Sequence, residues 1–316
     1  MPVVRHNVFT LFFTVLFAVL VTTWVLPVSG QLLAQGTGST KTGANGLNAV
    51  PLFRHIDPSK KDPDFKAYPV IRFAVVDNFP PFSYRTTTGA LSGFNISVAN
   101  SLCRILRTEC SFMVKSFEGA SSAIKTGGAD ALITGLRQNA KTADGLSFTR
   151  PYYRFSARFA VRQSTPITSN DVRSLAGKRL GVMVGTHHAR FLKENFRRSK
   201  IREFDNASDA HEGLRTGAID ALFGDSLKLM FWIKGAASKN CCRFAGDAYL
   251  DPQTFSPPMA IAVKRGNKKL RDLLDHALDR QQVSGRFSKI FRQYFPLSPW
   301  QDDNRKTADT KKESAS

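Results

Sequence analysis

The feature that most constrains the fold of this chain is a segment that occurs twice. The stretch AIKTGGADALITG, from Ala123 to Gly135, returns 90 residues later as GLRTGAIDALFGD, from Gly213 to Asp225, with five identical positions. Each copy predicts the end of a helix, a glycine turn and an apolar strand. We expect Gly127 and Gly217 to end the two helices, because glycine tolerates the positive φ found there. A supersecondary unit used twice indicates two similar α/β halves.

Strand and helix patterns alternate around both copies of this repeat. The runs IRFAVV and KRLGVMVG are typical of buried strands. Residues 93–107 place Phe94, Val98 and Leu102 on one face of a helix. In the second half, Thr186 and Ser208 are the expected N-caps of two helices. This order favours parallel sheets with helices packed on them.

The two ends of the chain have compositions unlike the middle. The 19 residues from Val8 to Leu26 are uncharged and follow a basic start, so residues 1–30 are predicted to be a signal peptide or an N-terminal anchor. Residues 31–68 are rich in Gly, Thr, Ser and Pro and read as a disordered linker. Residues 298–316 are predicted to be a disordered tail. Either reading of the N-terminus exports the rest of the chain.

The net charge of the chain is strongly positive, with 45 Lys and Arg against 25 Asp and Glu among 316 residues. Such a positive charge suggests nucleic acid, an anionic membrane surface or acidic small molecules as binding partners. No dense basic run or RNA-binding aromatic motif is present, so we expect no nucleic acid partner. The adjacent His187 and His188 point in different directions at a helix start, and no further ligand set accompanies them. We therefore expect neither a metal nor a cofactor.

The four cysteines fall into two pairs. Cys103 and Cys110 lie between a helix pattern and the next strand, where they are either a disulfide or two buried thiols. Export to an oxidising compartment favours the disulfide. Cys241 and Cys242 are adjacent, and the sequence leaves their redox state open.

Polar residues follow the strands of both copies of the repeat. In open α/β sheets, ligands bind at the carboxyl ends of strands, beside helix N-termini. The predicted strand of the first copy ends at Thr134 and Gly135, and that of the second copy ends at Gly224 and Asp225. If the halves are lobes that face each other, these residues line opposite walls of one cleft.

Several sequence blocks, in order, carry a family resemblance. They are VVDNFPPFSY, GALSGFNISVANSL, GGADALITGL, LSFTRPYY, LAGKRLGVMVGT and GAIDALFGDS. From about Ile71 to Phe295 the chain resembles the family 3 extracellular solute-binding proteins, the periplasmic receptors of amino-acid ABC importers. The resemblance implies an α/β fold of the periplasmic-binding-protein type II, with two doubly wound lobes joined by a hinge. Lobe 1 would comprise residues 69–154 and 256–297, and lobe 2 with the hinge strands residues 155–255.

The resemblance also implies a ligand site. Phe79 and Phe117 match aromatic positions that enclose the ligand side chain, and Thr134 and Gly135 match a strand end that offers backbone and hydroxyl contacts. The remaining matches are Thr186 and His187 at a helix N-terminus, which attracts a carboxylate, and Asp225, which holds the α-ammonium. The spacing of Cys103 and Cys110 resembles the disulfide of the basic-amino-acid and histidine receptors.

Two departures from the family pattern concern charged positions. The usual acidic position in the opening block falls on Val76, with Asp77 one step later. The usual arginine that clamps the α-carboxylate falls on Thr142, so Arg137 or Lys141 would supply that charge.

The expected function is that of a periplasmic, monomeric receptor. It would capture a small polar metabolite, an amino acid or a relative, and deliver it to an inner-membrane ABC permease without catalysing a reaction. The N-terminal segment leaves membrane tethering open. Two alternatives are a periplasmic dehydratase of the cyclohexadienyl type on the same fold and a membrane-tethered ligand sensor.

Overall fold

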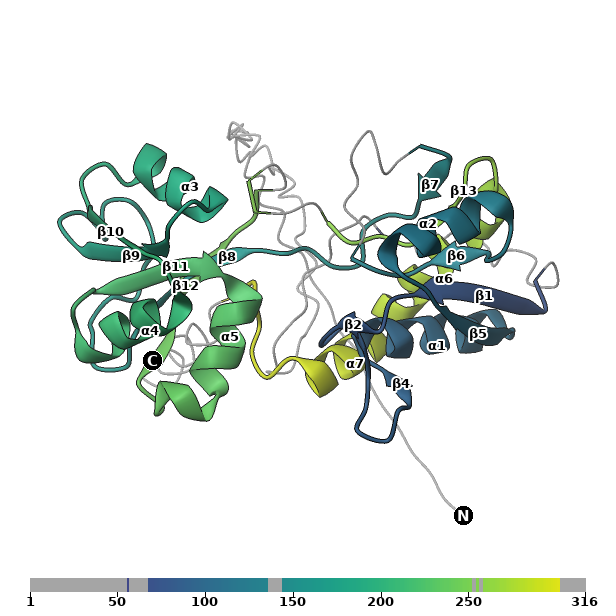
Figure 1. The fold of residues 1–316 in the computed structure, drawn as a ribbon, viewed down its shortest axis with the longest axis horizontal. Helices are drawn as coiled ribbons and strands as arrows, with labels where there is room; N and C mark the ends of the chain where they lie inside the picture. The colour runs from purple at the N-terminus through teal and green to yellow at the C-terminus, as the bar shows by residue number, and fades with distance from the viewer. Residues whose placement is uncertain (1–55, 57–67, 136–143, 252–253, 256–257, 302–316) are drawn as a thin grey trace, which may run out of the picture. The chain divides into compact units, whose positions relative to one another are not determined.

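The structure is a computed structural model that describes residues 56, 68–135, 144–251, 254–255 and 258–301. Two five-stranded sheets dominate it, and helices lie against each of them (Figure 1). We call each large sheet with its helices a lobe. The sheet of lobe 1 contains, in spatial order, β5 (Glu109–Val114), β1 (Val70–Val75), β6 (Ala131–Leu132), β13 (Ala262–Lys264) and β7 (Leu146–Phe148). The sheet of lobe 2 contains β10 (Lys200–Phe204), β9 (Arg179–Met183), β11 (Ala221–Asp225), β8 (Ala157–Arg162) and β12 (Cys242–Tyr249).

The two sheets share one topology. In each, the first three strands are parallel and the next two pair antiparallel, so β6 and β11, which lie within the two copies of the repeat, hold equivalent places. The predicted pair of doubly wound α/β lobes is therefore confirmed. A small third sheet of β2 (Asn78–Phe79), β3 (Ser83–Arg85) and β4 (Leu91–Ser92) follows β1.

Helices pack against apolar side chains on both faces of each sheet. Lobe 1 carries α1 (Phe94–Leu106), α2 (Phe117–Thr126), α6 (Lys268–Val283) and α7 (Arg286–Tyr294). Lobe 2 carries α3 (His187–Asn195), α4 (Ala207–Thr216), α5 (Ser226–Lys234) and the short 3-10 helix Ala236–Ser238. Along β1, Phe73 belongs to the core under α1 and α6, whereas Ala74 belongs to the core under α2. This alternation places helices on both sides of the strand.

The repeat has the local structure that its sequence predicts. Gly127 (φ 80°) and Gly217 (φ 86°) end α2 and α4 in the left-handed region. The aspartate three positions later in each copy accepts a hydrogen bond from a backbone N–H of the second strand of its sheet, β1 or β9. Arg72 N donates to Asp130 (2.9 Å), and Arg179 N donates to Asp220 (2.8 Å). The guanidinium groups of these arginines also bind the same carboxylates. Both aspartates therefore join the start of the third strand, β6 or β11, to the second strand, β1 or β9.

One predicted cap is wrong and one is confirmed. Thr186 caps α3 by accepting from Ala189 N at 3.1 Å. The cap of α4 is Asn206, not Ser208, because the helix begins two residues earlier and the Asn206 side chain accepts from Asp209 N.

Two extended segments connect the lobes and pair with each other. Tyr152 N donates to Met259 O (3.0 Å), and Met259 N donates to Tyr153 O (2.8 Å). The Tyr152 hydroxyl donates to Asn95 of α1, which fixes the first segment to lobe 1. Beyond this pairing, β8 begins at Ala157 directly opposite Asp225 of β11.

The chain after α7 is packed at its start. Residues 298–301, which the sequence assigned to the disordered tail, include Trp300, whose indole is 3% exposed and packs against Tyr153 and Phe291. The buried Arg158 of β8 donates to the carbonyls of Ser298 and Gln301. Paired main-chain carbonyls let this charge stay buried. Residues 302–316 lie outside the described residues, and so do Val8–Leu26 and nearly all of the predicted linker.

Both cysteine pairs are disulfides. Cys103 and Cys110 are bonded, as predicted, and join the last turn of α1 to β5. Cys241 and Cys242, whose state the sequence left open, are bonded to each other where β12 begins. Among the described residues, no helix is both long and apolar enough to cross a bilayer.

Candidate functional site

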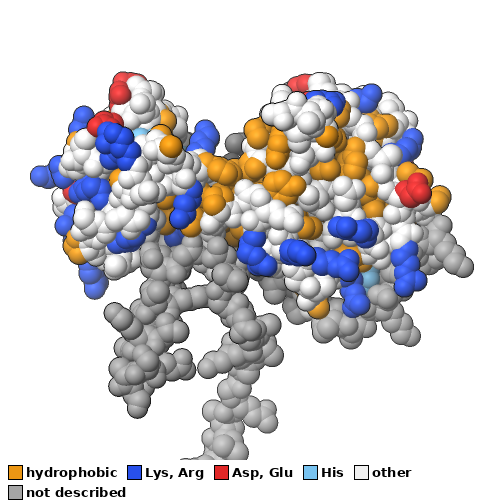
Figure 2. Space-filling model, turned by 90° about the horizontal axis from the view of Figure 1, so that it is seen from below, with side chains coloured by type: hydrophobic (Ala, Val, Ile, Leu, Met, Phe, Trp, Pro, Cys, Tyr) orange, Lys and Arg blue, Asp and Glu red, His pale blue; other side chains and the backbone are white. Residues whose placement is uncertain are grey.

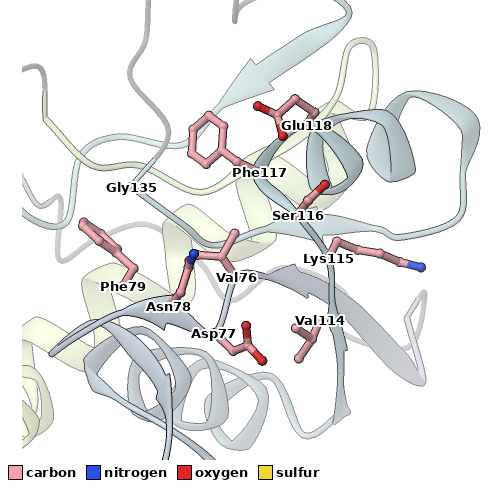
Figure 3. Close-up of a pocket in the computed structure, with 10 residues that line it drawn as sticks. All are labelled: Val76, Asp77, Asn78, Phe79, Val114, Lys115, Ser116, Phe117, Glu118 and Gly135. Carbon is pink, nitrogen blue, oxygen red and sulfur yellow. The ribbon is translucent and has the colours of Figure 1, made fainter.

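A pocket of about 590 Å³ lies at the carboxyl ends of the parallel strands of lobe 1. Its walls come from the residues after β1, the residues between β5 and α2, and Gly135 after β6 (Figure 3). Ser116 accepts from Gly119 N and caps α2, so α2 starts at Phe117 on the pocket wall. The parallel topology therefore brings together segments that are far apart in the sequence.

Two aromatic rings flank the loop after β6. The rings of Phe79 and Phe117 lie on either side of Gly135 in Figure 3. Phe79 is half-buried and stacks on the buried Phe82 with ring centroids 4.9 Å apart, whereas Phe117 is 42% exposed. A Cβ at position 135 would lie 2.7 Å from the Phe79 ring, so only glycine fits there without displacing the ring. A preformed aromatic surface with one exposed ring suits a flat or aliphatic ligand side chain.

Two carboxylates line the lobe 1 pocket, and they differ in their partners. Asp77 binds the Arg85 guanidinium at 2.6 Å, and in Figure 3 its side chain points away from both rings. Glu118, which the sequence reasoning missed, lies beside Phe117, is exposed, and makes no ion pair within the part of the chain that the structure describes. Glu118 is therefore the carboxylate of this pocket that remains available to a cation.

Thr134 directly precedes Gly135 but is not among the residues that line this pocket. Its side chain is 1% exposed, and its hydroxyl has no hydrogen-bond partner among the described residues. Arg137 and Lys141, the candidates for the carboxylate clamp, lie outside the described residues, as does Thr142.

A second pocket, of about 340 Å³, occupies the equivalent place in lobe 2, where β9 and β11 end. Thr186 and His187 line it at the start of α3, and Gly224 and Asp225 line it at the end of β11. His187 is exposed, and its Nδ1 lies 2.7 Å from the Arg190 guanidinium, which donates to it. The free backbone N–H groups at the start of α3 give this wall a partial positive charge.

Asp225 caps α5 and also faces the pocket. One carboxylate oxygen, Oδ1, accepts from Lys228 N at 2.9 Å. Burial, and after it the Asp225 charge, raise the pKa of Tyr153 well above its usual value. Asp225 therefore lies near Tyr153 of the connecting segment, in addition to facing its own lobe's pocket.

His188 is the second functional candidate that the sequence reasoning missed. Its ring stacks on Phe255 at 5.2 Å, and its buried Nε2 has no hydrogen-bond partner among the described residues. Burial lowers the pKa of His188, although the nearby Asp225 acts in the opposite direction. A neutral imidazole at the pocket wall can donate to or accept from a ligand. Within the described ranges, no group of three His, Cys, Asp or Glu residues is placed to hold a metal ion.

Most of the chain is similar to known proteins. Residues 71–297 match the family model of the bacterial extracellular solute-binding proteins, family 3. The chain belongs to this family. It is 31% identical over 226 residues to ABC transporter arginine-binding protein 1 of Escherichia coli, a match that covers 72% of this chain and 90% of that protein.

The chain is also similar to more distant relatives and to solved structures. The histidine-binding periplasmic protein of Salmonella typhimurium is 27% identical over 228 residues, which is 71% of this chain and 87% of that one. The second substrate-binding domain of a putative amino acid ABC transporter from Streptococcus pneumoniae has a TM-score of 0.61 and 26% identity, over 71% of this chain and 99% of that chain. An ancestral cyclohexadienyl dehydratase has a TM-score of 0.63 at 19% identity, over 72% of this chain and 93% of that chain, and this likeness concerns the fold alone.

Proposed function

We propose that this protein is a periplasmic receptor that captures an amino acid with a cationic side chain, arginine in the first place, and delivers it to an ABC permease. The observation that carries the proposal is the pair of pockets at equivalent strand ends of the two lobes, one aromatic and acidic, the other acidic beside a helix N-terminus. A zwitterionic ligand with a long cationic side chain needs this combination of groups.

The α-ammonium and α-carboxylate groups of the ligand would bind in the lobe 2 pocket. Asp225 uses Oδ1 for the α5 cap, so Oδ2 is available to accept from an α-ammonium group. The N–H groups at the start of α3 would bind the α-carboxylate, with Arg137 or Lys141 as an added positive charge. His188 would offer its unpaired Nε2 as a further contact.

The cationic side chain of the ligand would bind in the lobe 1 pocket. Phe79 and Phe117 would hold a guanidinium or ammonium group against their ring faces, and such contacts contribute about 0.5–2 kcal/mol each. Glu118 would neutralise the cation. The relatives named as arginine-binding proteins support this assignment.

Binding alone is the proposed activity. Closure of the two lobes on the ligand would present it to the permease, as hinge motions do in binding proteins. We further propose that the chain is exported through residues 1–30 and acts as a monomer, with tethering to the membrane decided by whether that segment is cleaved.

Isothermal titration calorimetry with a panel of ligands tests the proposal. The panel contains L-arginine, L-ornithine, L-histidine, L-glutamine and agmatine, the last of which lacks the α-carboxylate. We expect L-arginine to bind with a Kd in the micromolar range or below, and agmatine to bind at least a hundredfold more weakly. Absence of binding by every amino acid, or turnover of prephenate, would contradict the receptor function.

A further inference from the structure

A groove of about 690 Å³ runs between α1 and α7 of lobe 1 and belongs to neither pocket described above. Arg104, Arg286 and Lys289 supply three positive charges to it, and Asn100 and Gln293 supply amide groups. None of the described residues that line the groove is acidic. None of its three cations makes an ion pair within the part of the chain that the structure describes. Figure 2 shows a row of Lys and Arg side chains across the right-hand lobe on this side of the molecule.

The start of α7 adds to this positive charge. Gly285 precedes the helix with φ 71°, no side chain in the described part of the chain caps it, and its first turn holds no acidic residue. The N-terminus of a helix carries a partial positive charge, so Arg286 and Lys289 are unfavourably placed in the free protein. An anion bound between them would relieve both the uncapped helix end and the repulsion among the cations.

A buried hydroxyl on the wall of the groove gives an independent indication of a ligand. Ser101 is 1% exposed, lines the groove from α1, and its Oγ has no hydrogen-bond partner among the described residues. Leaving a buried hydroxyl unpaired costs about 1–3 kcal/mol, so such groups usually have a partner. A ligand oxygen seated between the two helices would supply that partner.

We propose that the α1–α7 groove is a binding site for a phosphate-bearing anion. The two guanidinium groups match phosphate oxygens as forks, and Lys289 adds a point charge. The Ser101 hydroxyl donates to the same group. The volume exceeds that of one phosphate, so the phosphate is borne on a larger molecule, either a soluble phosphate compound or the headgroup of an anionic phospholipid. This site is separate from the proposed amino-acid site and does not depend on it.

Calorimetry with inorganic pyrophosphate tests the site, with the full chain kept in nonionic detergent. The double variant Arg286→Ala/Lys289→Ala removes two groove cations. The matched control Lys268→Ala/Lys269→Ala removes two exposed cations of α6 in the same lobe, outside the groove. We expect the groove variant to bind pyrophosphate at least tenfold more weakly and the control to bind within twofold of the wild type. Equal losses in both variants, or no binding by the wild type, would overturn the proposal.

The Ser101→Ala variant tests whether the groove binds the anion through specific contacts or only through its general positive charge. Because the hydroxyl has no hydrogen-bond partner among the described residues, we expect its removal to leave the melting temperature unchanged or slightly higher. We expect pyrophosphate affinity to fall about fivefold, with L-arginine affinity unchanged. Wild-type pyrophosphate affinity in Ser101→Ala would refute the role of this hydroxyl and, with it, the site as proposed.

Sedimentation with vesicles distinguishes the two sources of phosphate. Vesicles of phosphatidylglycerol and phosphatidylcholine are compared with vesicles of phosphatidylcholine alone, which report any insertion of the apolar N-terminal segment. A loss of the phosphatidylglycerol-dependent fraction in the groove variant, but not in the α6 control, supports a lipid headgroup. Retention of that fraction, together with the calorimetric loss, supports a soluble phosphate compound.

Discussion

At the scale of residues, the aspartates of the repeat have two different roles. Asp130 and Asp220 form ion pairs with arginines of neighbouring strands, so both carboxylates have a structural role. Asp225, five positions after Asp220, caps α5 with one oxygen and faces the lobe 2 pocket. The same residue type is therefore structural inside the sheet and available to a ligand where the strand ends.

The Asp225→Asn variant tests the ligand role without removing the cap. Asparagine caps helices about as well as aspartate, so we expect the melting temperature to stay within about 2 °C of the wild type. Loss of a charge-assisted hydrogen bond of about 1.5–3 kcal/mol predicts roughly a 10- to 150-fold weaker Kd for L-arginine by calorimetry. Unchanged affinity would remove Asp225 from the site.

The Asp220→Asn variant should change the acid stability of the protein instead. Hydrogen bonds from the Arg179 side chain, against the opposing effect of burial, lower the pKa of Asp220. A carboxylate whose folded-state pKa is lowered stabilises the protein fully above its unfolded pKa of about 3.9, and this contribution is lost as the pH falls towards the folded-state value.

We therefore expect Asp220→Asn to be about 1 kcal/mol less stable than the wild type at pH 7. The difference should shrink below about pH 4, because the wild type then loses the same interaction. Urea unfolding at pH 7 and at pH 3 measures both quantities. A difference that stays constant across this range would contradict the assignment.

Sequence reasoning found the residues that stand at strand ends and missed those that depend on packing. Asp225 and Thr186 were accessible because each follows a recognisable strand. Glu118 looked like an ordinary acidic residue in the first turn of a helix. His188 becomes a candidate only because its ring is buried against Phe255, which lies 67 residues away. No local sequence pattern predicts that contact.

At the scale of elements, the disulfide Cys103–Cys110 holds the last turn of α1 to β5. Closing a loop of this length restricts the unfolded chain by about 2–3 kcal/mol in the chain-entropy model. We expect the double variant Cys103→Ser/Cys110→Ser to lose this amount in urea unfolding while still binding L-arginine. Alkylation of both thiols in native wild-type protein without reductant would show that the bond is absent.

The loop that follows β6 depends on a close approach to an aromatic ring. Gly135→Ala would place a methyl group about where the Phe79 ring now lies, so the ring must shift. Since overpacking of this kind costs about 1–3 kcal/mol, we expect L-arginine affinity to fall about tenfold. The exposed Gly128→Ala is the control, because its φ is not positive and a Cβ there would make only ordinary contacts of 3.5 Å or more, with Ala123. Equal affinities in both variants would show that the Phe79 position does not matter to the ligand.

Element order was predictable, whereas element boundaries were not. The apolar runs and the glycine after each helix predicted both sheets and the helix ends at Gly127 and Gly217. The start of α4 was misplaced by two residues, because Asn206 and Ser208 are both good caps and the choice depends on where the chain leaves β10.

At the scale of the whole molecule, two connecting segments and the chain after α7 meet around Tyr153. Trp300 packs on Tyr153, and its indole N–H donates to Arg154 O at 2.7 Å. The sequence predicted a tail from residue 298, because a polar run follows and nothing local indicates a partner. The partner is Arg158, a buried charge whose acceptors lie about 140 residues further along the chain.

The central claim is that one ligand is held by groups of both lobes. Titration calorimetry of L-arginine against the wild type, Phe117→Ala in lobe 1 and Asp225→Asn in lobe 2 tests it most directly. We expect one arginine per chain, a Kd about 2- to 30-fold weaker in Phe117→Ala, and a Kd about 10- to 150-fold weaker in Asp225→Asn. Two independent arginine sites, or a loss of affinity confined to one of the two variants, would contradict it.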